Sequence, residues 1–345
     1  MENIYNYTLD ELGKIVEELG EKKFKANQIY NWLYKKKVKS FDEMTDLKKD
    51  FIEVLKNKFV IGSIKIDKKE EDKDVNKYLF KLKDGEYIEA VLMHHDYGES
   101  ICVSSQIGCN MGCKFCESGR RKKVRNLESG EIVEQILLVE EDVGTRISHV
   151  VVMGIGEPFD NYDNIINFIK IINDPKGLEI GIRHITVSTC GLVIKIDSFA
   201  KDSGGANLAI SLHAPNDKIR SEIMPINKVY KIKDIMKSIK KYIDESGRRV
   251  TFEYVMLDGV NDSHECALEL SHLLKGLNCY VNLIPYNETE NIGYKRSKIF
   301  KIMEFYDILK KNNINVTIRR EFGSKISAAC GQLRSRKEEA WKPFI

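Results

Sequence analysis

Four of the eight cysteines in this chain lie within fifteen residues, at spacings that could bind metal. Cys109, Cys113 and Cys116 form a C-x3-C-x2-C triplet, CNMGCKFC, and Cys102 precedes the triplet by seven residues. Cysteine thiolates hold iron–sulfur clusters, and a 4Fe-4S cube usually takes four of them. Three closely spaced thiolates can therefore hold three irons and leave the fourth iron open to a ligand. A structural zinc site with Cys102 as its fourth ligand is the alternative, but such sites more often use paired C-x2-C units, so the spacing favours the cluster.

Single residues elsewhere in the chain are less specific. Cys330, in SAACGQL near the C-terminus, would by itself be a core cysteine, as free cysteines usually are. Gly156 would by itself be a turn glycine, and His213 a structural histidine. These two and several neighbours nevertheless fall at the C-terminal ends of predicted strands, where the sites of βα barrels assemble. Their shared placement makes them candidate site residues.

The elements that must position these residues alternate along most of the chain. From about residue 100 onward, strand-like runs are separated by helical patterns, and the runs lie at 101–105, 149–154, 183–189, 207–213, 250–257, 280–286 and 314–320. This alternation predicts an α/β fold with a mainly parallel sheet covered by helices. The units are too few for a complete eight-fold barrel, so we expect a partial, open βα barrel over residues 96–345.

Two smaller units are predicted before the barrel. Residues 1–62 have helical periodicity with capping boxes at Thr8–Glu11 and Ser40–Glu43, and predict a small helical domain. Residues 63–95 alternate in polarity around an Asp84-Gly85 turn, and predict a connecting β-hairpin region. Because this domain carries lysines interleaved with aromatic residues in 22–39, as RNA-binding surfaces do, we expect it to be an RNA-binding accessory domain.

Composition sets the class of protein. Hydrophobic residues make up 42% and charged residues 31% of the 345, as in a soluble globular protein. Neither a membrane-spanning run nor a signal peptide is recognisable, so we expect a cytoplasmic protein without membrane contact.

Net charge is only +3, but the cations are clustered. Seven lysines interleaved with aromatic residues lie in 22–39, and five cations fill six positions in 120–125. Such clusters suit an RNA surface, whereas the alternative for the first is a solvated helix face with its aromatic residues in the core.

The triplet is typical of radical S-adenosylmethionine enzymes, and further matches run along the chain. They are CVSSQIGC (102–109), RNL (125–127), MGIGEP (153–158), VST (187–189), SLHAPND (211–217), MPIN (224–227), YVMLDGVND (254–262), NLIPYN (282–287) and AACGQL (328–333). With these motifs the sequence resembles the RlmN family of dual-specificity RNA adenine methyltransferases over nearly its whole length. The resemblance implies a radical S-adenosylmethionine fold and an RNA methyltransferase activity.

The resemblance also implies a cofactor site. One 4Fe-4S cluster would be held by the triplet, and two S-adenosylmethionine molecules would be used per turnover. The methionine part of the cofactor would contact Gly156 and Glu157. Its pocket would be completed by Ser188, Ser211, Leu212, His213 and Asn287.

A two-cysteine mechanism is implied as well. Cys330 would accept a methyl group, and radical chemistry would join the methyl carbon to the adenine ring as a protein–RNA crosslink. Glu89 would accept the ring proton. Cys102 would then attack the Cys330 sulfur, release methylated adenosine and leave a transient disulfide between the two cysteines.

The implied substrates are an adenosine in the peptidyl-transferase centre of 23S rRNA and the adenosine 3′ of the anticodon in tRNA, both methylated at carbon 2. A flavodoxin- or ferredoxin-type electron donor is also implied, and we expect a monomer. The basic stretch 120–125 departs from the smaller, glycine-containing run usual in the family, which leaves substrate choice open.

Three other functions remain as alternatives. The sister Cfr family methylates carbon 8 and has the same cysteines, although Pro158, Ile107 and the SLHAPND motif favour RlmN. A non-enzymatic zinc-containing RNA-binding protein would leave Cys330 without a purpose. A radical enzyme for a small molecule would leave the N-terminal domain unexplained.

Overall fold

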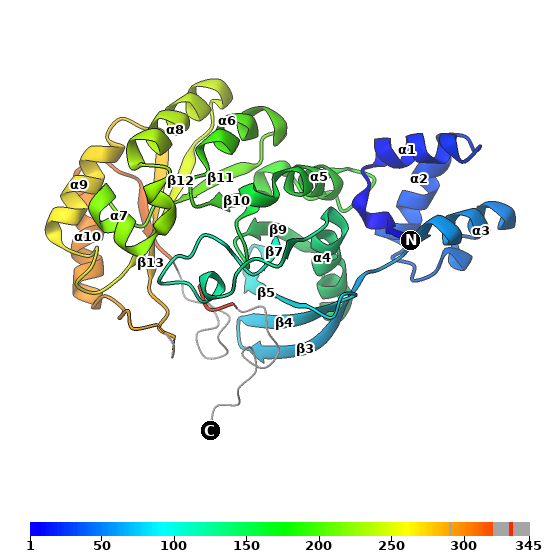
Figure 1. The fold of residues 1–345 in the computed structure, drawn as a ribbon, viewed down its shortest axis with the longest axis horizontal. Helices are drawn as coiled ribbons and strands as arrows, with labels where there is room; N and C mark the ends of the chain where they lie inside the picture. Colours follow the sequence, from blue (N-terminus) through cyan, green and yellow to red (C-terminus); the bar gives the residue numbers. More distant parts are fainter. Residues whose placement is uncertain (290–291, 320–330, 334–345) are drawn as a thin grey trace.

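The computed structural model describes residues 1–289, 292–319 and 331–333. Within them, ten strands form one sheet in the order β14-β13-β12-β11-β10-β9-β6-β5-β4-β3 (Figure 1). The strands are β3 (Ile64–Asp72), β4 (Val75–Leu82), β5 (Tyr87–His95), β6 (Gly98–Cys102), β9 (Ile147–Val152), β10 (Ile185–Thr189), β11 (Asn207–Ser211), β12 (Val250–Met256), β13 (Cys279–Pro285) and β14 (Val316–Ile318).

The strands from β6 to β14 in this order are all parallel to their neighbours. Helices lie on the outer face of this curved sheet (Figure 1). They are α4 (Ser129–Val143), α5 (Tyr162–Asn173), α6 (Val193–Asp202), α7 (Asp217–Ile223), α8 (Ile232–Ser246), α9 (His264–Leu274) and α10 (Ile299–Lys311). The predicted α/β class and the open, partial βα barrel are therefore confirmed.

The predicted hairpin is present but belongs to a larger unit. β4 and β5 are antiparallel around the Asp84-Gly85 turn, where Gly85 has φ +85°. β3 pairs with β4, and β5 pairs with β6, so all three strands extend the barrel sheet. β3 was not predicted as a strand because its run, IKIDKKEED, is mostly charged. Charged side chains suit an edge strand, since they oppose pairing with another chain.

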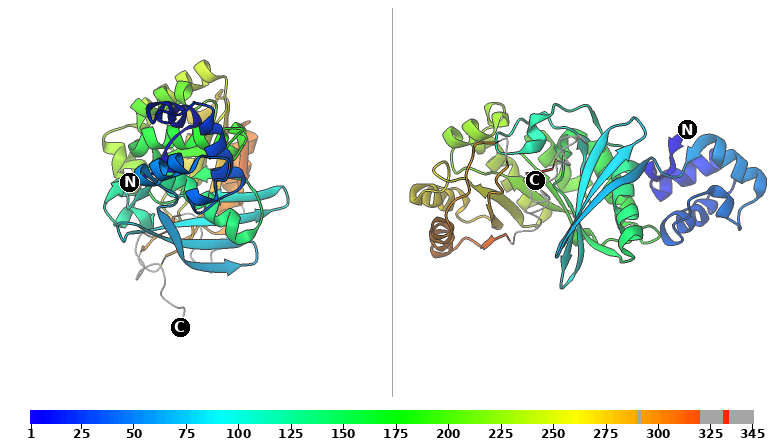
Figure 2. Two further views of the ribbon diagram at one scale, coloured as in Figure 1. Left: turned by 90° about the vertical axis from the view of Figure 1, so that its right-hand side faces the viewer. Right: turned by 90° about the horizontal axis from the view of Figure 1, so that it is seen from below.

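The N-terminal unit stands beside the barrel, on the far side of strands β3 to β5 (Figure 2). It contains β1 (Glu2–Asn3), η1 (Ile4–Asn6), α1 (Leu9–Glu18), α2 (Lys25–Tyr30), η2 (Asn31–Lys35), η3 (Phe41–Glu43), α3 (Lys49–Lys58) and β2 (Phe59–Val60). Both predicted capping boxes form, at Thr8 and Ser40. The helical segment that begins with α2 continues as a π-helical turn after Tyr30.

The lysine-rich segment 22–39 makes contacts within the fold. Lys37 pairs with Glu140 and Lys39 with Glu141, both on α4, and Lys35 pairs with Glu179 in the loop after α5. These lysines therefore join the N-terminal unit to the barrel. The aromatic rings of Tyr30, Trp32 and Tyr34 are buried, while Phe24 is exposed. For these three rings the core alternative is correct.

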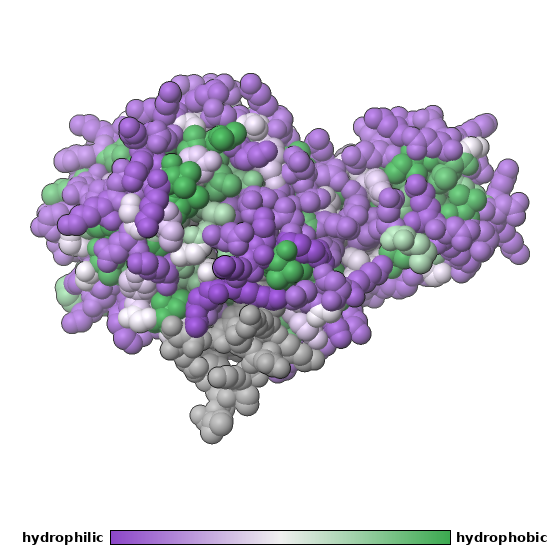
Figure 3. Space-filling model, in the orientation of Figure 1, coloured by the Kyte–Doolittle hydropathy of each residue, from purple (hydrophilic) through white to green (hydrophobic). Residues whose placement is uncertain are grey.

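The outer surface shown in Figure 3 is largely hydrophilic, with apolar side chains in small separate groups. Within the described ranges, no helix combines the length and the apolar character needed to cross a membrane.

A buried carboxylate anchors the N-terminal unit to α4. Glu134 accepts hydrogen bonds from the backbone of Ser63 (2.7 Å) and of Ile64 (3.0 Å), and from the side chain of Asn3. Glu134 is 3% exposed, so water is largely excluded from these bonds. Buried donors that lose their acceptor cost free energy, and the anchor therefore contributes to stability.

We expect Glu134→Ala to lower the free energy of unfolding by about 3 kcal/mol, because several buried donors lose a charged acceptor. The control is Glu141→Ala on the same helix, which removes only an exposed pair with Lys39 and should cost about 0.5 kcal/mol or less. Urea titration measures both changes. Equal losses in the two variants would contradict the anchoring role.

Candidate active site

An open cavity of about 1510 Å³, its mouth included, lies at the C-terminal ends of the parallel strands. It is the position at which βα barrels place their sites. The cavity brings together most of the residues that sequence analysis singled out. Those lining it are Cys102, Cys109, Cys113, Cys116, Gly156, Glu157, Ser188, Ser211, His213 and Asn287.

Three predicted site residues are not among those that line the cavity. Leu212 is buried in the main core, and its carbonyl accepts a hydrogen bond, so its side chain does not line the cavity. Glu89 is fully buried in β5 and pairs with Lys77 rather than lining the cavity. Cys330 lies outside the described residues, while Gly331, next along the chain, lines the cavity.

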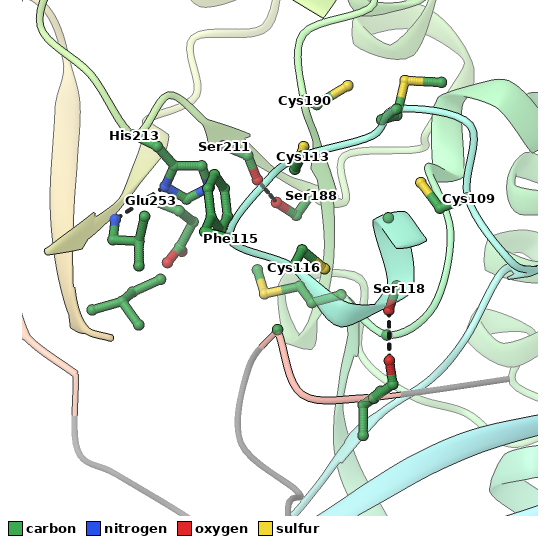
Figure 4. A pocket seen from close by; sticks show the side chains of 18 of the residues that line it. Cys109, Cys113, Phe115, Cys116, Ser118, Ser188, Cys190, Ser211, His213 and Glu253 are labelled. Carbon is green, nitrogen blue, oxygen red and sulfur yellow. Dashed lines mark hydrogen bonds between the residues drawn. The ribbon is translucent and has the colours of Figure 1, made fainter. Parts of the chain in front are cut away.

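The cysteine triplet lies on a loop whose backbone is fixed at several points. The Cys109 amide donates to the Arg121 carbonyl (2.9 Å), and the Lys114 amide donates to the Ile223 carbonyl at the end of α7 (2.9 Å). Gly108 has φ +74°, and a Cβ there would lie 2.4 Å from the Lys122 carbonyl oxygen. These contacts hold the three thiols around one open space (Figure 4).

The chemistry of the three sulfur donors suits iron. Burial raises the pKa of the Cys109 thiol to about 12 and that of Cys113 well above its usual range. A metal-bound cysteine is a thiolate, and the positive charge of the metal compensates its desolvation. An all-sulfur donor set is the set that iron–sulfur clusters use. The residues present therefore fit such a cluster.

Gly156 and Glu157 shape the turn after β9. Gly156 has φ +110°, and a Cβ there would lie 2.6 Å from Gln106 Cβ, so only glycine fits without displacement. The Glu157 carboxylate is buried and accepts from the amides of Cys190 (2.8 Å) and Phe159 (2.9 Å). Burial raises the pKa of Glu157. The carboxylate thus joins the loops after β9 and β10.

The strand ends of β10 and β11 place two hydroxyls and an imidazole at the cavity. Ser188 Oγ lies 3.3 Å from Ser211 Oγ, and His213 follows two residues later with φ +57° (Figure 4). His213 Nδ1 accepts the Val255 amide (3.0 Å), and burial lowers the pKa of the imidazole to about 3. His213 is therefore neutral, and its proton is on Nε2.

Two buried charged residues at this site were not predicted from the sequence. Arg220 of α7 is 0% exposed and donates to the carbonyls of Cys190 (2.6 Å) and Leu212 (3.1 Å). Glu253 of β12 lines the cavity and accepts from Asn282 (2.9 Å). An acid within the apolar run VTFEYVM could have identified Glu253 as a candidate site residue. No local pattern identifies Arg220, because a helix arginine is usually solvated.

The basic stretch 120–125 is largely neutralised within the fold. Arg121 pairs with Glu86 (2.7 Å), and Arg125 pairs with Asp84 (2.6 Å), so both reach the β4–β5 turn. Lys123 pairs with Asp160 (2.6 Å), while Lys122 is exposed. The stretch thus fixes the cysteine loop to the sheet.

Comparisons with known proteins cover both parts of the chain. Residues 2–61 match the ribosomal RNA large subunit methyltransferase N-terminal domain, and residues 103–270 match the radical SAM superfamily. The probable dual-specificity RNA methyltransferase RlmN of Spiroplasma citri is 52% identical over 342 residues, covering 98% of this chain and 99% of that protein. Its counterpart in Streptococcus agalactiae is 53% identical over 342 residues, covering 96% and 93%.

A solved structure agrees with these sequence matches. The crystal structure of a radical SAM methyltransferase from Sphaerobacter thermophilus superimposes with a TM-score of 0.92. It is 40% identical, and the match covers 97% of this chain and 99% of that one. The similarity therefore extends over the barrel and the N-terminal unit together.

We expect Gly156→Ala to cost about 3 kcal/mol, because strain at positive φ is added to the clash with Gln106. Gly144→Ala is the matched control, since Gly144 has φ +68° but nothing within 4 Å of the position that a Cβ would take, and should cost about 1 kcal/mol. Thermal unfolding of both variants tests the difference. Similar losses would mean that the close approach at Gly156 is relieved by movement of the turn.

Proposed function

The chain belongs to the RlmN family of radical S-adenosylmethionine RNA methyltransferases, and from this premise we propose that it methylates carbon 2 of two adenosines. One lies in the peptidyl-transferase centre of 23S rRNA, and the other immediately 3′ of the anticodon in tRNA. The observation that carries the proposal is the gathering of the cysteine triplet, Cys102 and the strand-end residues around one cavity. The printed name of the relatives, dual-specificity RNA methyltransferase, supports two RNA substrates.

Membership of the family implies a 4Fe-4S cluster and S-adenosylmethionine. Cys109, Cys113 and Cys116 would hold the cluster, which with S-adenosylmethionine supplies the radical chemistry that activates a methyl group. Two S-adenosylmethionine molecules would be used per turnover, one for the methyl group and one for its activation. A flavodoxin- or ferredoxin-type protein would deliver the electron. The enzyme would act as a monomer in the cytoplasm, where its RNA substrates are.

The strand-end residues would bind the cofactor. Gly156 and Glu157 line the cavity, and their backbone would contact the methionine part of the cofactor. Ser188 and Ser211 offer hydroxyls, His213 can offer the proton on Nε2, and Asn287 also lines the cavity. Leu212 would contribute through its position in the backbone between Ser211 and His213.

Cys330 would carry the methyl group, and Cys102 would release the product. Cys102 lies at the cavity end of β6 and is half-buried. The Glu117 amide donates to the Gly331 carbonyl (2.9 Å), and Ser118 Oγ donates to the Leu333 carbonyl (2.9 Å), so the chain just after Cys330 is attached to the cysteine loop. These contacts support an exchange between the Cys102 and Cys330 sulfurs at this cavity.

We expect the reconstituted enzyme to produce 2-methyladenosine in a protein-free 23S rRNA fragment and in tRNA. The protein is loaded anaerobically with iron and sulfide, and incubated with S-adenosylmethionine and a reductant. Nucleoside mass spectrometry then compares the product with both methyladenosine standards. Methylation at carbon 8 would instead assign the Cfr-type reaction. Cleavage of the cofactor without any methyladenosine would refute both RNA assignments.

We expect Cys102→Ala to accumulate a covalent protein–RNA adduct, because the thiol that releases the product is gone. Denaturing gel electrophoresis with labelled RNA measures the adduct. Cys279→Ala is the control, since Cys279 is buried in β13 and does not line the cavity. Normal product without an adduct in the Cys102 variant would exclude the exchange step.

A further inference from the structure

A buried ion pair lies beside the cavity, between two neighbouring strands. Lys77 Nζ of β4 is 2.8 Å from Glu89 Oε1 of β5, and the two side chains are 1% and 0% exposed. Glu70, opposite Lys77 on β3, is a second carboxylate on the same face of the sheet, and its side chain is 30% exposed. Lys77 was not among the residues that sequence analysis selected.

We propose that Lys77 is a positioning residue for the proton-transfer step, whose ammonium keeps Glu89 in place as a carboxylate beside the bound adenine. The inference rests on the proposed function and on the two-cysteine mechanism that the family resemblance implies, in which Glu89 accepts the ring proton. It adds a residue that does not touch the substrate but acts through the base.

Strand register places the pair on the cavity face of the sheet. Val91 of β5 lies opposite Lys77 on one side and opposite Cys102 on the other. Residues paired across strands share a face, and Val91 and Cys102 both line the cavity, so Lys77 and Glu89 belong to that face. β5 runs antiparallel to β6, so Glu89 lies nearer than Val91 to the edge at which the site is built.

The energetics of burial indicate a role beyond stability. A carboxylate removed from water without a partner takes up a proton, because a medium of low polarity disfavours the charged form. The Lys77 ammonium, 2.8 Å from one carboxylate oxygen, opposes this protonation by charge attraction. Buried ion pairs are nevertheless often no more stable than well-packed apolar side chains of similar volume. The pair is therefore better explained by the need for an ionised base.

In the proposed step, a proton moves from the adenine ring to Glu89. The proton leaves the adenine carbon for a carboxylate oxygen of Glu89, and the electron pair of the broken C–H bond stays with the ring. Lys77 keeps its three protons and exchanges no electrons. Glu89 becomes a neutral carboxylic acid and must return its proton to water before the next turnover.

Lys77→Met tests the proposal in the full-length, cluster-loaded enzyme. Because the carboxylate loses its ammonium partner, we expect resolution of the protein–RNA adduct to slow by about 10- to 100-fold. The adduct should then accumulate in single-turnover reactions while cofactor cleavage and the KM for RNA stay close to the parent values. Lys77→Arg retains the charge and should restore resolution to within about three-fold of the parent.

Lys69→Met is the matched control. Lys69 lies on β3 and pairs with Asp142 of α4 at 2.7 Å, on the side of the sheet away from the cavity. Its loss removes a lysine–carboxylate pair from the same sheet, and should leave adduct resolution unchanged. Thermal unfolding establishes that each variant is folded. Should Lys77→Met not fold, Lys77→Gln takes its place, with the same expected accumulation.

Two outcomes would overturn the proposal. Resolution of the adduct at the parent rate in the uncharged Lys77 variant means that Glu89 does not need its partner. Equal slowing in the Lys69 and Lys77 variants means that the pair is structural. Failure of the proposed function is distinguishable from both, because Cys102→Ala would then form no adduct even with Lys77 intact.

Discussion

The peptide backbone at Cys190 is held from both sides by buried charge, and the site is built around it. The Glu157 carboxylate accepts its amide, and the Arg220 guanidinium donates to its carbonyl. Glu157 lies in the loop after β9, while Arg220 also holds the loop after β11 through Leu212. Three consecutive strand ends are thereby fixed to one another. Because hydrogen bonds with charged groups are roughly twice as strong as neutral ones, this arrangement keeps the cavity wall in one geometry before any ligand arrives.

Local patterns in the sequence predict much of the barrel and of the cavity lining. Strand periodicity, the capping boxes at Thr8 and Ser40, and the strand-end positions of Gly156 and His213 depend on neighbouring residues, which a sequence displays directly. Pairings between distant residues are not displayed in this way. The sequence around Arg220 does not distinguish it from a solvated helix arginine. The residues next to Lys77 in the sequence likewise do not indicate a carboxylate partner on the next strand. The charged strand β3 was missed for a related reason, since its role is set by its place at the sheet edge.

Many of the clustered cations in the sequence pair with acids of the same chain. In the segment 22–39, lysines join the N-terminal unit to acids of α4. In 120–125 the cations pair mainly with acids of the β4–β5 turn, of α4 and of the short helix η5 (Pro158–Asn161). Both clusters therefore position parts of the protein relative to one another. The first orients the N-terminal unit on the barrel, and the second fixes the cysteine loop that fits the cluster. RNA would meet a surface on which many of these charges are already compensated.

The anchor at Glu134 has a consequence for synthesis of the chain. Asn3 and Glu134 are separated by 131 positions, and Ser63 and Glu134 by 71. A chain that emerges from the ribosome N-terminus first completes its small helical unit long before α4 exists to receive it. At typical elongation speeds the interval is several seconds, roughly 5–20 residues being added each second. The unit must therefore remain folded, or at least unaggregated, through its own short-range contacts until its docking partner is translated.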